Sequence, residues 1–338
     1  MLKNDRILTA HGAGGKMSQA LTERIFLKYF HDPALLMLND NAVFDVPGGR
    51  VAMSTDTYTI DPIFFPGGDI GSLSVHGTVN DVAMCGAVPV AISAGFILEE
   101  GLPLEDLEII AASMATAAAT AGVRIVTADT KVVPRGAADR IFINTTGIGI
   151  IPEGRTIGGQ MAKTDDVILL SGTIGDHGIA VASSREGIQF ETVVRSDSAP
   201  LNSMVSALVG TLGDRVHVLR DPTRGGLATV LNEISAQSNV GIRINEGAIP
   251  VSAGVQGACE LFGYDPLYLA NEGKLVAIVS SVAAEDALRL MRSDPLGRET
   301  AIIGEVVGEH PGRVVMNTPL GGHRLVDRLS GEMLPRIC

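Results

Sequence analysis

The sequence predicts two domains of α/β or α+β layers. In both halves of the 338-residue chain, apolar segments typical of strands alternate with segments typical of helices. A stretch rich in turn residues, at residues 152–164, separates the two halves. Glycine is abundant at 40 residues and aromatic residues make up only 4%, which fits a core of small aliphatic side chains joined by many tight turns.

Residues 1–35 are expected to form a glycine-containing arm and a short helix, and residues 36–155 the first domain. This domain is predicted to contain strands at 50–55, 88–98, 124–128 and 140–150, and helices at 72–85 and 104–121. The helix at 104–121 is rich in alanine, but it follows acidic residues and is amphipathic, so it is not a membrane span.

The second domain, residues 156–317, begins with a buried strand at 167–171 and a helix that opens at Gly175 and Asp176. Further strands are predicted at 216–219, 240–244, 275–279 and 301–307, and helices at 199–211, 225–237, 252–262 and 284–292. Residues 318–338 have turn residues at both ends, and we expect them to form a flexible tail outside the core.

Charge and cysteine content argue against several classes of protein. The net charge is −12 and no basic patch stands out, so a nucleic-acid partner is not expected. No apolar run is long enough to span a bilayer, and the N-terminus lacks the apolar region of a signal peptide. Cys85, Cys259 and Cys338 are far apart and include no CxxC pair, which favours a reducing compartment. We therefore expect a cytoplasmic protein without a membrane partner.

Several acidic residues stand beside turns or small residues, where carboxylates often bind metal. Mg²⁺ takes one or two carboxylates per ion, and phosphates and water complete its shell. Each of these acids alone would more often be a helix cap or a turn residue, but several at strand ends in one chain favour a metal–phosphate site. They are Asp40, Asp56, Asp81, Asp129, Asp221 and Glu272.

The segment RDPTRGG, residues 220–226, is the strongest single motif. Gly225 and Gly226 precede an amphipathic helix, whose first free N–H groups can bind phosphate. Arg224 can pair with phosphate oxygens through two N–H groups, and Asp221 can hold a bridging metal. The alternative is that Asp221 and Thr223 only cap the helix. An earlier motif, GAGGK at 12–16, lacks the residues of a phosphate-binding loop and is compatible with a glycine-rich flap.

Two charged residues next to predicted strands are candidates for proton transfer. Lys131 follows Asp129 by two residues, just past the strand at 124–128, where it can neutralise phosphate or move a proton. Glu272 stands just before the strand at 275–279 and can be a general base or a metal ligand. For both residues the alternative is an exposed charge at the edge of a strand.

The last residue, Cys338, is an unusual chain end. Its thiolate would be favoured by the neighbouring Arg336. A thiol on a flexible tail can act as a carrier that swings between a partner's site and its own.

Together these motifs resemble those of the HypE family, the carbamoyl dehydratases of hydrogenase maturation. The resemblance runs from His11 to Cys338 and rests on HGTVNDVAMCGA, DTYTIDPIFFPGGDIG, ADTKVV, GDHG, RDPTRGG, NEGK and the terminal PRIC. The motifs before PRIC are shared with a superfamily that includes aminoimidazole ribonucleotide synthetase, selenophosphate synthetase and thiamine-monophosphate kinase. The PRIC terminus distinguishes HypE from these relatives.

The resemblance implies a fold and a reaction. The N-terminal domain would be a mixed sheet that pairs with its twin in a homodimer, the C-terminal domain an α/β layer, and ATP with Mg²⁺ would bind between them. The family receives a carbamoyl group from the carbamoyltransferase HypF on its terminal cysteine and dehydrates it to a thiocyanate with ATP. It then passes cyanide to iron held by the HypC–HypD complex, for [NiFe]-hydrogenase.

The resemblance also implies roles for individual residues. The catalytic residues would be Cys338, Glu272 and Lys131, with Glu272 as the base. Nucleotide contacts would come from Asn80, Asp129, Thr130, Arg224, Gly225 and Gly226, and His76 would orient groups nearby. The metal ligands would be Asp40, Asp56, Asp81 and Asp221. Relatives often carry paired acids where this chain has Asn39 and Asp40, so the number of metal ions stays open.

Two other functions are compatible with the same residues. One is an ATP-using enzyme of the superfamily that acts on a free small molecule, as selenophosphate synthetase does. Those enzymes use a reactive residue near the N-terminus, and this chain has no cysteine before Cys85. The other is a non-catalytic scaffold whose tail docks a partner.

Overall fold

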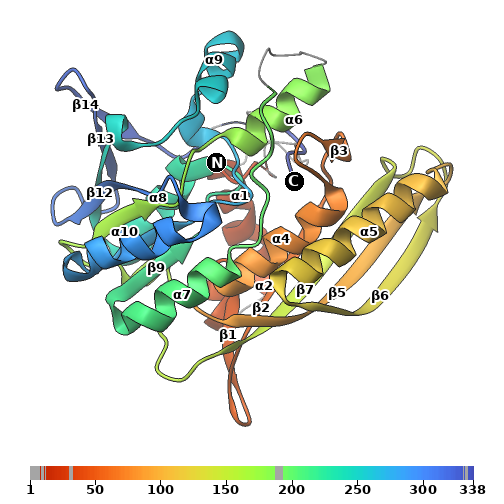
Figure 1. Cartoon of the computed structure of the whole chain (residues 1–338), viewed down its shortest axis with the longest axis horizontal. Coiled ribbons are helices and arrows are strands. Elements are labelled where there is room, and N and C mark those ends of the chain that lie inside the picture. The colour runs from red at the N-terminus through yellow and green to blue at the C-terminus, as the bar shows by residue number, and fades with distance from the viewer. Residues whose placement is uncertain are drawn as a thin grey trace.

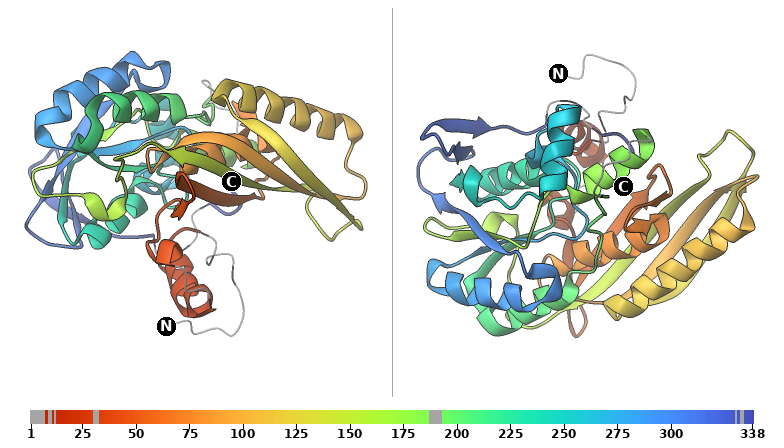
Figure 2. Two further views of the ribbon diagram at one scale, coloured as in Figure 1. Left: turned by 90° about the horizontal axis from the view of Figure 1, so that it is seen from below. Right: turned by 45° about the horizontal axis from the view of Figure 1, so that its top comes forward.

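The computed structural model describes residues 8, 11, 13–29, 33–186, 193–329, 331 and 334–338. Most of the expected N-terminal arm, and Gly12 of its glycine motif, lie outside these residues. The described chain begins with short helices that project from the side opposite α5 (Figure 2, left): α1 Lys16–Leu21, a π-helical turn Thr22–Phe26, α2 Leu27–Tyr29 and α3 Pro33–Leu36.

The first sheet is mixed and has five strands in the order β1-β2-β7-β5-β6. Its strands are β1 Ala42–Val46, β2 Gly49–Tyr58, β5 Val88–Glu99, β6 Arg124–Val133 and β7 Ile141–Ile151. All neighbours pair antiparallel except β5 and β6, which are parallel. The sequence prediction missed the β1–β2 hairpin, and it ended β6 five residues too early.

Two helices cover one face of this sheet: α4 Ile70–Ala83 and α5 Leu104–Ala121 (Figure 1). Asp69 starts α4, because its side chain accepts hydrogen bonds from the N–H groups of Gly71 and Ser72. Between the helices and the sheet lies an apolar core that includes the buried Leu73 and Ile110. A short hairpin of β3 Phe64–Phe65 and β4 Gly68–Asp69 precedes α4.

The opposite face of the first sheet carries partly exposed apolar side chains. Met53 on β2, Ile148 and Ile150 on β7 and Ile97 on β5 are each 40–52% exposed. A solvated face of an antiparallel sheet usually carries polar side chains, so this face is more apolar than solvation requires.

The second sheet has seven strands in the order β14-β13-β10-β12-β8-β11-β9, all antiparallel pairs except β10 with β13. The strands are β8 Val167–Leu170, β9 Val216–Arg220, β10 Gly241–Asn245, β11 Val276–Val279, β12 Ala301–Val307, β13 Val314–Asn317 and β14 His323–Val326. The helices are α6 Asp176–Glu186, α7 Asn202–Leu212, α8 Gly226–Ser238, α9 Ala253–Phe262 and α10 Ala284–Ser293.

Strands β8, β9 and β11 of the second sheet are buried on both faces. Its strands alternate in the faces they present, so that Leu169 packs with α7 and α10, while Ile168 and Leu170 pack with α8. The two domains therefore form α/β layers with mixed sheets, as predicted. Within the described part of the chain, no helix is both long and apolar enough to cross a membrane.

The end of the chain does not lie wholly outside the core, as the sequence had suggested. Residues His323–Val326 form β14, the edge strand beside β13. The last residues lie between α6 and the β3–β4 hairpin (Figure 1), where Ile337 is buried in the core of the first domain. The reason is that Ile337 offers an apolar side chain that the first domain can bury.

Two consecutive glycines place the start of α8. Gly225 and Gly226 have φ values of +79° and +63°, a conformation that strains other residues. A Cβ atom on Gly226 would stand only 2.5 Å from the carbonyl oxygen of Leu267 and 2.7 Å from that of Leu269. The helix can approach the 267–269 segment this closely only with glycine at 226.

We expect Gly226→Ala to lower the free energy of unfolding by about 2 kcal/mol or more, because it adds both steric overlap and a strained φ. Gly210 in α7 is a matched control, since a Cβ there would meet nothing within 4 Å and its φ is not in the left-handed range. Gly210→Ala should raise stability by up to about 1 kcal/mol. Urea unfolding measures both, and equal effects of the two variants would contradict the close approach.

Candidate active site

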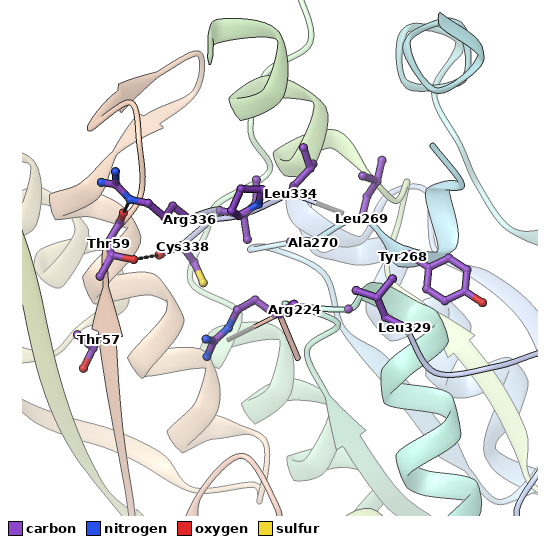
Figure 3. Close-up of a pocket in the computed structure, with 14 residues that line it drawn as sticks. Thr57, Thr59, Arg224, Tyr268, Leu269, Ala270, Leu329, Leu334, Arg336 and Cys338 are labelled. Atoms are coloured by element: carbon purple, nitrogen blue, oxygen red, sulfur yellow. Dashed lines mark hydrogen bonds between the residues drawn. The ribbon is translucent and has the colours of Figure 1, made fainter. Parts of the chain in front are cut away.

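A cavity of about 290 Å³ lies where the two domains meet (Figure 3). The first domain contributes Thr57 and Thr59 at the end of β2, and the second contributes Arg224 and Gly225 before α8. The 268–270 segment and the C-terminal residues 334–338 line the rest of the wall. Part of the wall is therefore the end of the protein's own chain.

Cys338 is seated in this cavity by its main chain. The N–H group of Thr59 donates to the Cys338 carbonyl oxygen at 3.0 Å, and the sulfur points toward the side where the Arg224 guanidinium lies (Figure 3). Burial raises the pKa of the Cys338 thiol to about 12, although Arg224 acts in the opposite direction. In this position the thiol keeps its proton at neutral pH.

Arg336 does not activate the thiol, contrary to the sequence prediction. Its Nε donates to the carbonyl oxygen of Thr59 at 2.8 Å, and its guanidinium pairs with Asp139. The side chain thus points to the first domain, and Arg224 is the cation that faces the sulfur.

Four of the predicted metal ligands and Glu272 are close enough to affect one another's ionisation. Burial raises the pKa of Asp40 to about 6, and the pKa values of Asp81, Asp221 and Glu272 well above the ordinary range. For Asp81, Asp221 and Glu272 the next contribution comes from a neighbouring carboxylate, whereas for Asp40 it comes from Arg220, which lowers the pKa. Asp56 adds to the upward shift of all four. These five acids come from five segments. Asp40 lies in the loop before β1, Asp56 on β2, Asp81 on α4, Asp221 at the end of β9 and Glu272 in the segment before β11.

The structure explains how several of these acids are held. Asp40 Oδ2 lies 2.8 Å from Nε of the buried Arg220, which also bonds Glu233 at 2.6 Å. Asp81 Oδ2 accepts from the Ser54 hydroxyl at 2.7 Å. The sequence analysis missed Arg220, although it stands directly before Asp221 in RDPTRGG.

Asn80 and Asn39 are occupied by main-chain contacts between the domains. Asn80 donates to the Ala199 carbonyl at 3.0 Å and accepts from the Leu201 N–H at 2.7 Å. The amide oxygen of Asn39 accepts from the Gly159 N–H at 3.0 Å. Asn80 therefore joins α4 to the second domain, and the structure does not turn it toward the cavity.

The phosphate motif is arranged differently from the prediction in one respect. The Gly226 N–H donates to the Thr223 carbonyl at 2.9 Å, so it is not free for a phosphate. Arg224 does face the site: the proximity of Cys338, then of Asp56 and Glu272, raises the pKa of its guanidinium despite burial. The position of Arg224 is therefore compatible with its predicted role of pairing with phosphate oxygens.

Asp129, Thr130 and Lys131 lie apart from this cluster. They are inside the edge strand β6, which β5 and β7 separate from β2. Lys131 Nζ pairs with Asp129 Oδ2 at 2.7 Å, and both side chains are at least 70% exposed. The strand continues past residue 128, and this carries Lys131 to the surface.

Another lysine lies beside Glu272. Lys274 Nζ is 3.4 Å from Asp197 Oδ2, and Asp197 Oδ1 accepts the Glu272 N–H at 3.1 Å. The sequence signal for Lys274 was its place in NEGK, but nothing in the sequence pointed to Asp197.

Two histidines differ from their predicted importance. His76 Nδ1 lies 3.0 Å from the Ser198 hydroxyl, and burial lowers the pKa of its ring to about 4. It faces a groove between α4, α5 and α7 rather than Cys338. His177, to which the sequence analysis assigned no role, contacts the C-terminal segment through Nε2 at 2.7 Å from the Ile337 carbonyl.

The carboxylates fit a divalent cation that shares its shell with phosphate. Among the described residues, no three acidic, histidine or cysteine side chains converge as a complete metal site. However, Asp221 Oδ2 is buried without a hydrogen-bond partner among the described residues, and burial beside like-charged neighbours raises the pKa values of this cluster. A Mg²⁺ ion bound by one or two carboxylates and phosphate oxygens would meet both conditions.

Family models define the class of protein to which this fold and site belong. Residues 38–151 match the N-terminal domain of AIR synthase related proteins, and residues 163–317 match the C-terminal domain. The two matched segments correspond to the two domains described above.

Full-length relatives narrow the class. Carbamoyl dehydratase HypE of Cupriavidus necator is 55% identical over 100% of this chain and 96% of its own length. A crystal structure of a HypE–HypF complex is 51% identical with a TM-score of 0.87, covering 92% of this chain and 100% of that chain. A structure of HypE in complex with ATP is 54% identical with a TM-score of 0.83, covering 98% and 100%. This chain belongs to the HypE family of carbamoyl dehydratases.

The carboxylate cluster should cost stability when no cation is bound. A carboxyl group whose pKa is raised in the folded protein binds its proton more tightly there, so its favourable contribution is present at low pH. That contribution is lost as the pH rises from about 4 through the raised folded value, which is about 6 for Asp40. We expect Asp81→Asn to raise the unfolding free energy at pH 7 by an amount on the order of 1 kcal/mol.

Thermal unfolding at pH 5 and pH 8, with and without Mg²⁺, tests this expectation. The gain from Asp81→Asn should be larger at pH 8, and Mg²⁺ should stabilise the variant less than the unchanged protein. A variant that is less stable at pH 8, or equally stabilised by Mg²⁺, would contradict the assignment.

Proposed function

We propose that this protein dehydrates a carbamoyl group on the sulfur of its own Cys338 to a thiocyanate, with ATP as the second substrate. The observation that carries the proposal is the position of the Cys338 sulfur, in the interdomain cavity near Arg224, Glu272 and Asp56. A relative of 54% identity is solved in complex with ATP, which supports the nucleotide part of the reaction.

The reaction needs a better leaving group than an amide oxygen. Transfer of the γ-phosphoryl group to the carbamoyl oxygen, with loss of one N–H proton, produces ADP and turns that oxygen into part of a phosphate ester. Loss of the second N–H proton and departure of phosphate then leave S–C≡N. The phosphoryl step requires charge neutralisation and positioning more than covalent participation by the protein.

The residues of the cavity can supply these requirements. Arg224 would stabilise negative charge on the transferred phosphoryl group. Glu272 would accept a proton from the carbamoyl nitrogen, because its raised pKa makes it a stronger base than an ordinary glutamate once it is ionised. Asp40, Asp56, Asp81 and Asp221 would hold Mg²⁺, which when bound neutralises phosphate charge.

Loading of the carbamoyl group belongs to a different position of the chain end. A thiol with a pKa of about 12 is a poor nucleophile at neutral pH. We therefore place carbamoyl transfer outside the cavity, on a donor protein. A HypE relative is solved in a complex with HypF, which supports HypF as that donor; the HypC–HypD complex as cyanide acceptor stays a prediction.

A homodimer and a cytoplasmic location also remain proposals. The apolar outer face of the first sheet, with Met53, Ile97 and Ile148 exposed, would suit a second copy of the chain. Because Asp129, Thr130 and Lys131 lie on β6 of the same sheet, such a dimer is the arrangement in which they could approach a nucleotide.

Cys338 itself provides the direct test. After incubation with the carbamoyltransferase, carbamoyl phosphate and ATP, the C-terminal peptide should gain the mass of a carbamoyl group and then lose that of one water. If ATP is removed once the carbamoyl group has been loaded, the gained mass should persist without the loss of water. Cys338→Ser should abolish both changes and Cys259→Ala neither. ATP hydrolysis with an unchanged C-terminal peptide would favour an enzyme acting on a free small molecule.

Glu272→Gln should slow the loss of water by about 100-fold or more, because the amide cannot accept the proton. Carbamoyl loading should remain unchanged. In the unmodified protein, the dehydration rate should rise with pH to an apparent pKa well above 4.5, the ordinary value. Single-turnover rates across pH measure this. Unchanged rates in Glu272→Gln and in Asp221→Ala would contradict the roles assigned to these residues, and no ATP-dependent loss of water in the unmodified protein would support a non-catalytic scaffold.

A further inference from the structure

The C-terminal residues 335–338, here termed the terminal segment, lie alongside residues 59–61 and run antiparallel to them. The Thr59 N–H donates to the Cys338 carbonyl at 3.0 Å, and the Asp61 N–H donates to the Arg336 carbonyl at 3.3 Å. Arg336 has a left-handed φ of +52°, so the segment is bent and is held by these bonds without forming a regular strand.

Helix α6 holds the other side of the terminal segment. Arg185 donates from Nη1 to the Pro335 carbonyl at 2.7 Å and from Nη2 to the Arg336 carbonyl at 2.9 Å. His177 Nε2 lies 2.7 Å from the Ile337 carbonyl. The two side chains are eight residues apart on α6, about two helical turns, and so share one face.

The hydrogen bonds define the state of His177. A carbonyl oxygen only accepts, so Nε2 carries the hydrogen, and Nδ1 is left to accept from the Ser196 hydroxyl at 2.8 Å. Burial lowers the pKa of this ring, which agrees with a neutral histidine. The Ser196 contact thus fixes the tautomer that donates to the terminal segment.

Every carbonyl from 335 to 338 has a donor in this arrangement. Arg185 also donates from Nε to the Asp61 carbonyl at 3.0 Å, so one guanidinium joins the terminal segment to residues 59–61 beside it. Carbonyl groups carry no side-chain information, and therefore these donors recognise the path of the main chain. The buried Ile337 side chain supplies the apolar anchor.

We propose that Arg185 and His177 are positioning residues that hold the terminal segment and set the register in which the Cys338 sulfur meets Arg224 and Glu272. The proposal deepens the dehydratase function and rests on it for its catalytic consequence. The register matters because neighbouring residues of a chain are about 3.3 Å apart, so a slip by one residue would displace the Cys338 sulfur by about that distance relative to Arg224 and Glu272. At that displacement its carbamoyl group would lie outside the reach of Glu272.

Thiol accessibility tests the proposal without the enzymatic reaction. In Arg185→Ala, iodoacetamide should alkylate Cys338 roughly tenfold faster or more, since charged hydrogen bonds are each worth about that factor. Arg185→Lys should fall between, because lysine lacks the planar fork. Arg289→Ala is the matched control, an exposed arginine paired with Asp286 within its own helix. Cys85 and Cys259 are buried and should stay unreactive in each folded variant.

The same variants should separate loading from dehydration. Arg185→Ala should slow ATP-dependent loss of water by roughly tenfold or more, while carbamoyl loading and ATP affinity stay unchanged. His177→Ala should behave alike, and His177→Gln should recover part of the rate, since its amide can still donate. A merely structural role would expose Cys85 and Cys259 and weaken ATP binding together.

The outcomes distinguish this proposal from the function on which it rests. Unchanged alkylation and dehydration in Arg185→Ala and His177→Ala would overturn the positioning role and leave the function standing. Faster alkylation of Cys338 in variants of a protein that never loses water from its carbamoyl group would support the positioning role and contradict the dehydratase function. Exposure of all three cysteines would refute a specific positioning role.

Discussion

Mutual repulsion among buried carboxylates at the junction of the two domains is the constraint on which the rest of the site depends. Asp40, Asp56, Asp81, Asp221 and Glu272 come from both domains, and burial with like-charged neighbours raises the pKa of four of them. Such a cluster is costly without a counter-charge, and Arg220 and Arg224 compensate only part of it. The remaining negative charge prepares the junction for a cation and phosphates, at the expense of stability in their absence.

Rigid contacts elsewhere keep that junction closed. Asn80 on α4 joins two main-chain groups of the second domain, and Asn39 joins a third. These amides are neutral and bond to main-chain groups, so they hold the domains together without adding charge to the junction. The amides thus fix the geometry of the junction, while the carboxylates and arginines set its electrostatic potential.

A substrate attached to the protein's own chain end changes the energetics of binding. The terminal segment does not lose translational freedom when it docks, so modest main-chain hydrogen bonds are sufficient to hold it. The same docking raises the thiol pKa and suppresses its reactivity. In the proposed reaction the docked cysteine is therefore protected, and its carbamoyl group is loaded outside the cavity.

Local sequence patterns determined most helices and strands but not the tertiary contacts between them. The helix at 104–121 was predicted with its observed bounds, because its periodicity and the left-handed Gly122 that ends it are local features. The sequence by itself also determined the mixed α/β class, and it predicted the acidic candidates and a role for Cys338, since these depend on residue type and spacing. Only the tertiary structure decided that Lys131 faces solvent, that Gly226 uses its N–H in a turn, and that Arg220, Asp197, His177 and Arg185 join the site. These facts depend on which groups, often more than a hundred residues apart, come within a few ångströms. Packing of two domains decides that, and no spacing along the chain encodes it.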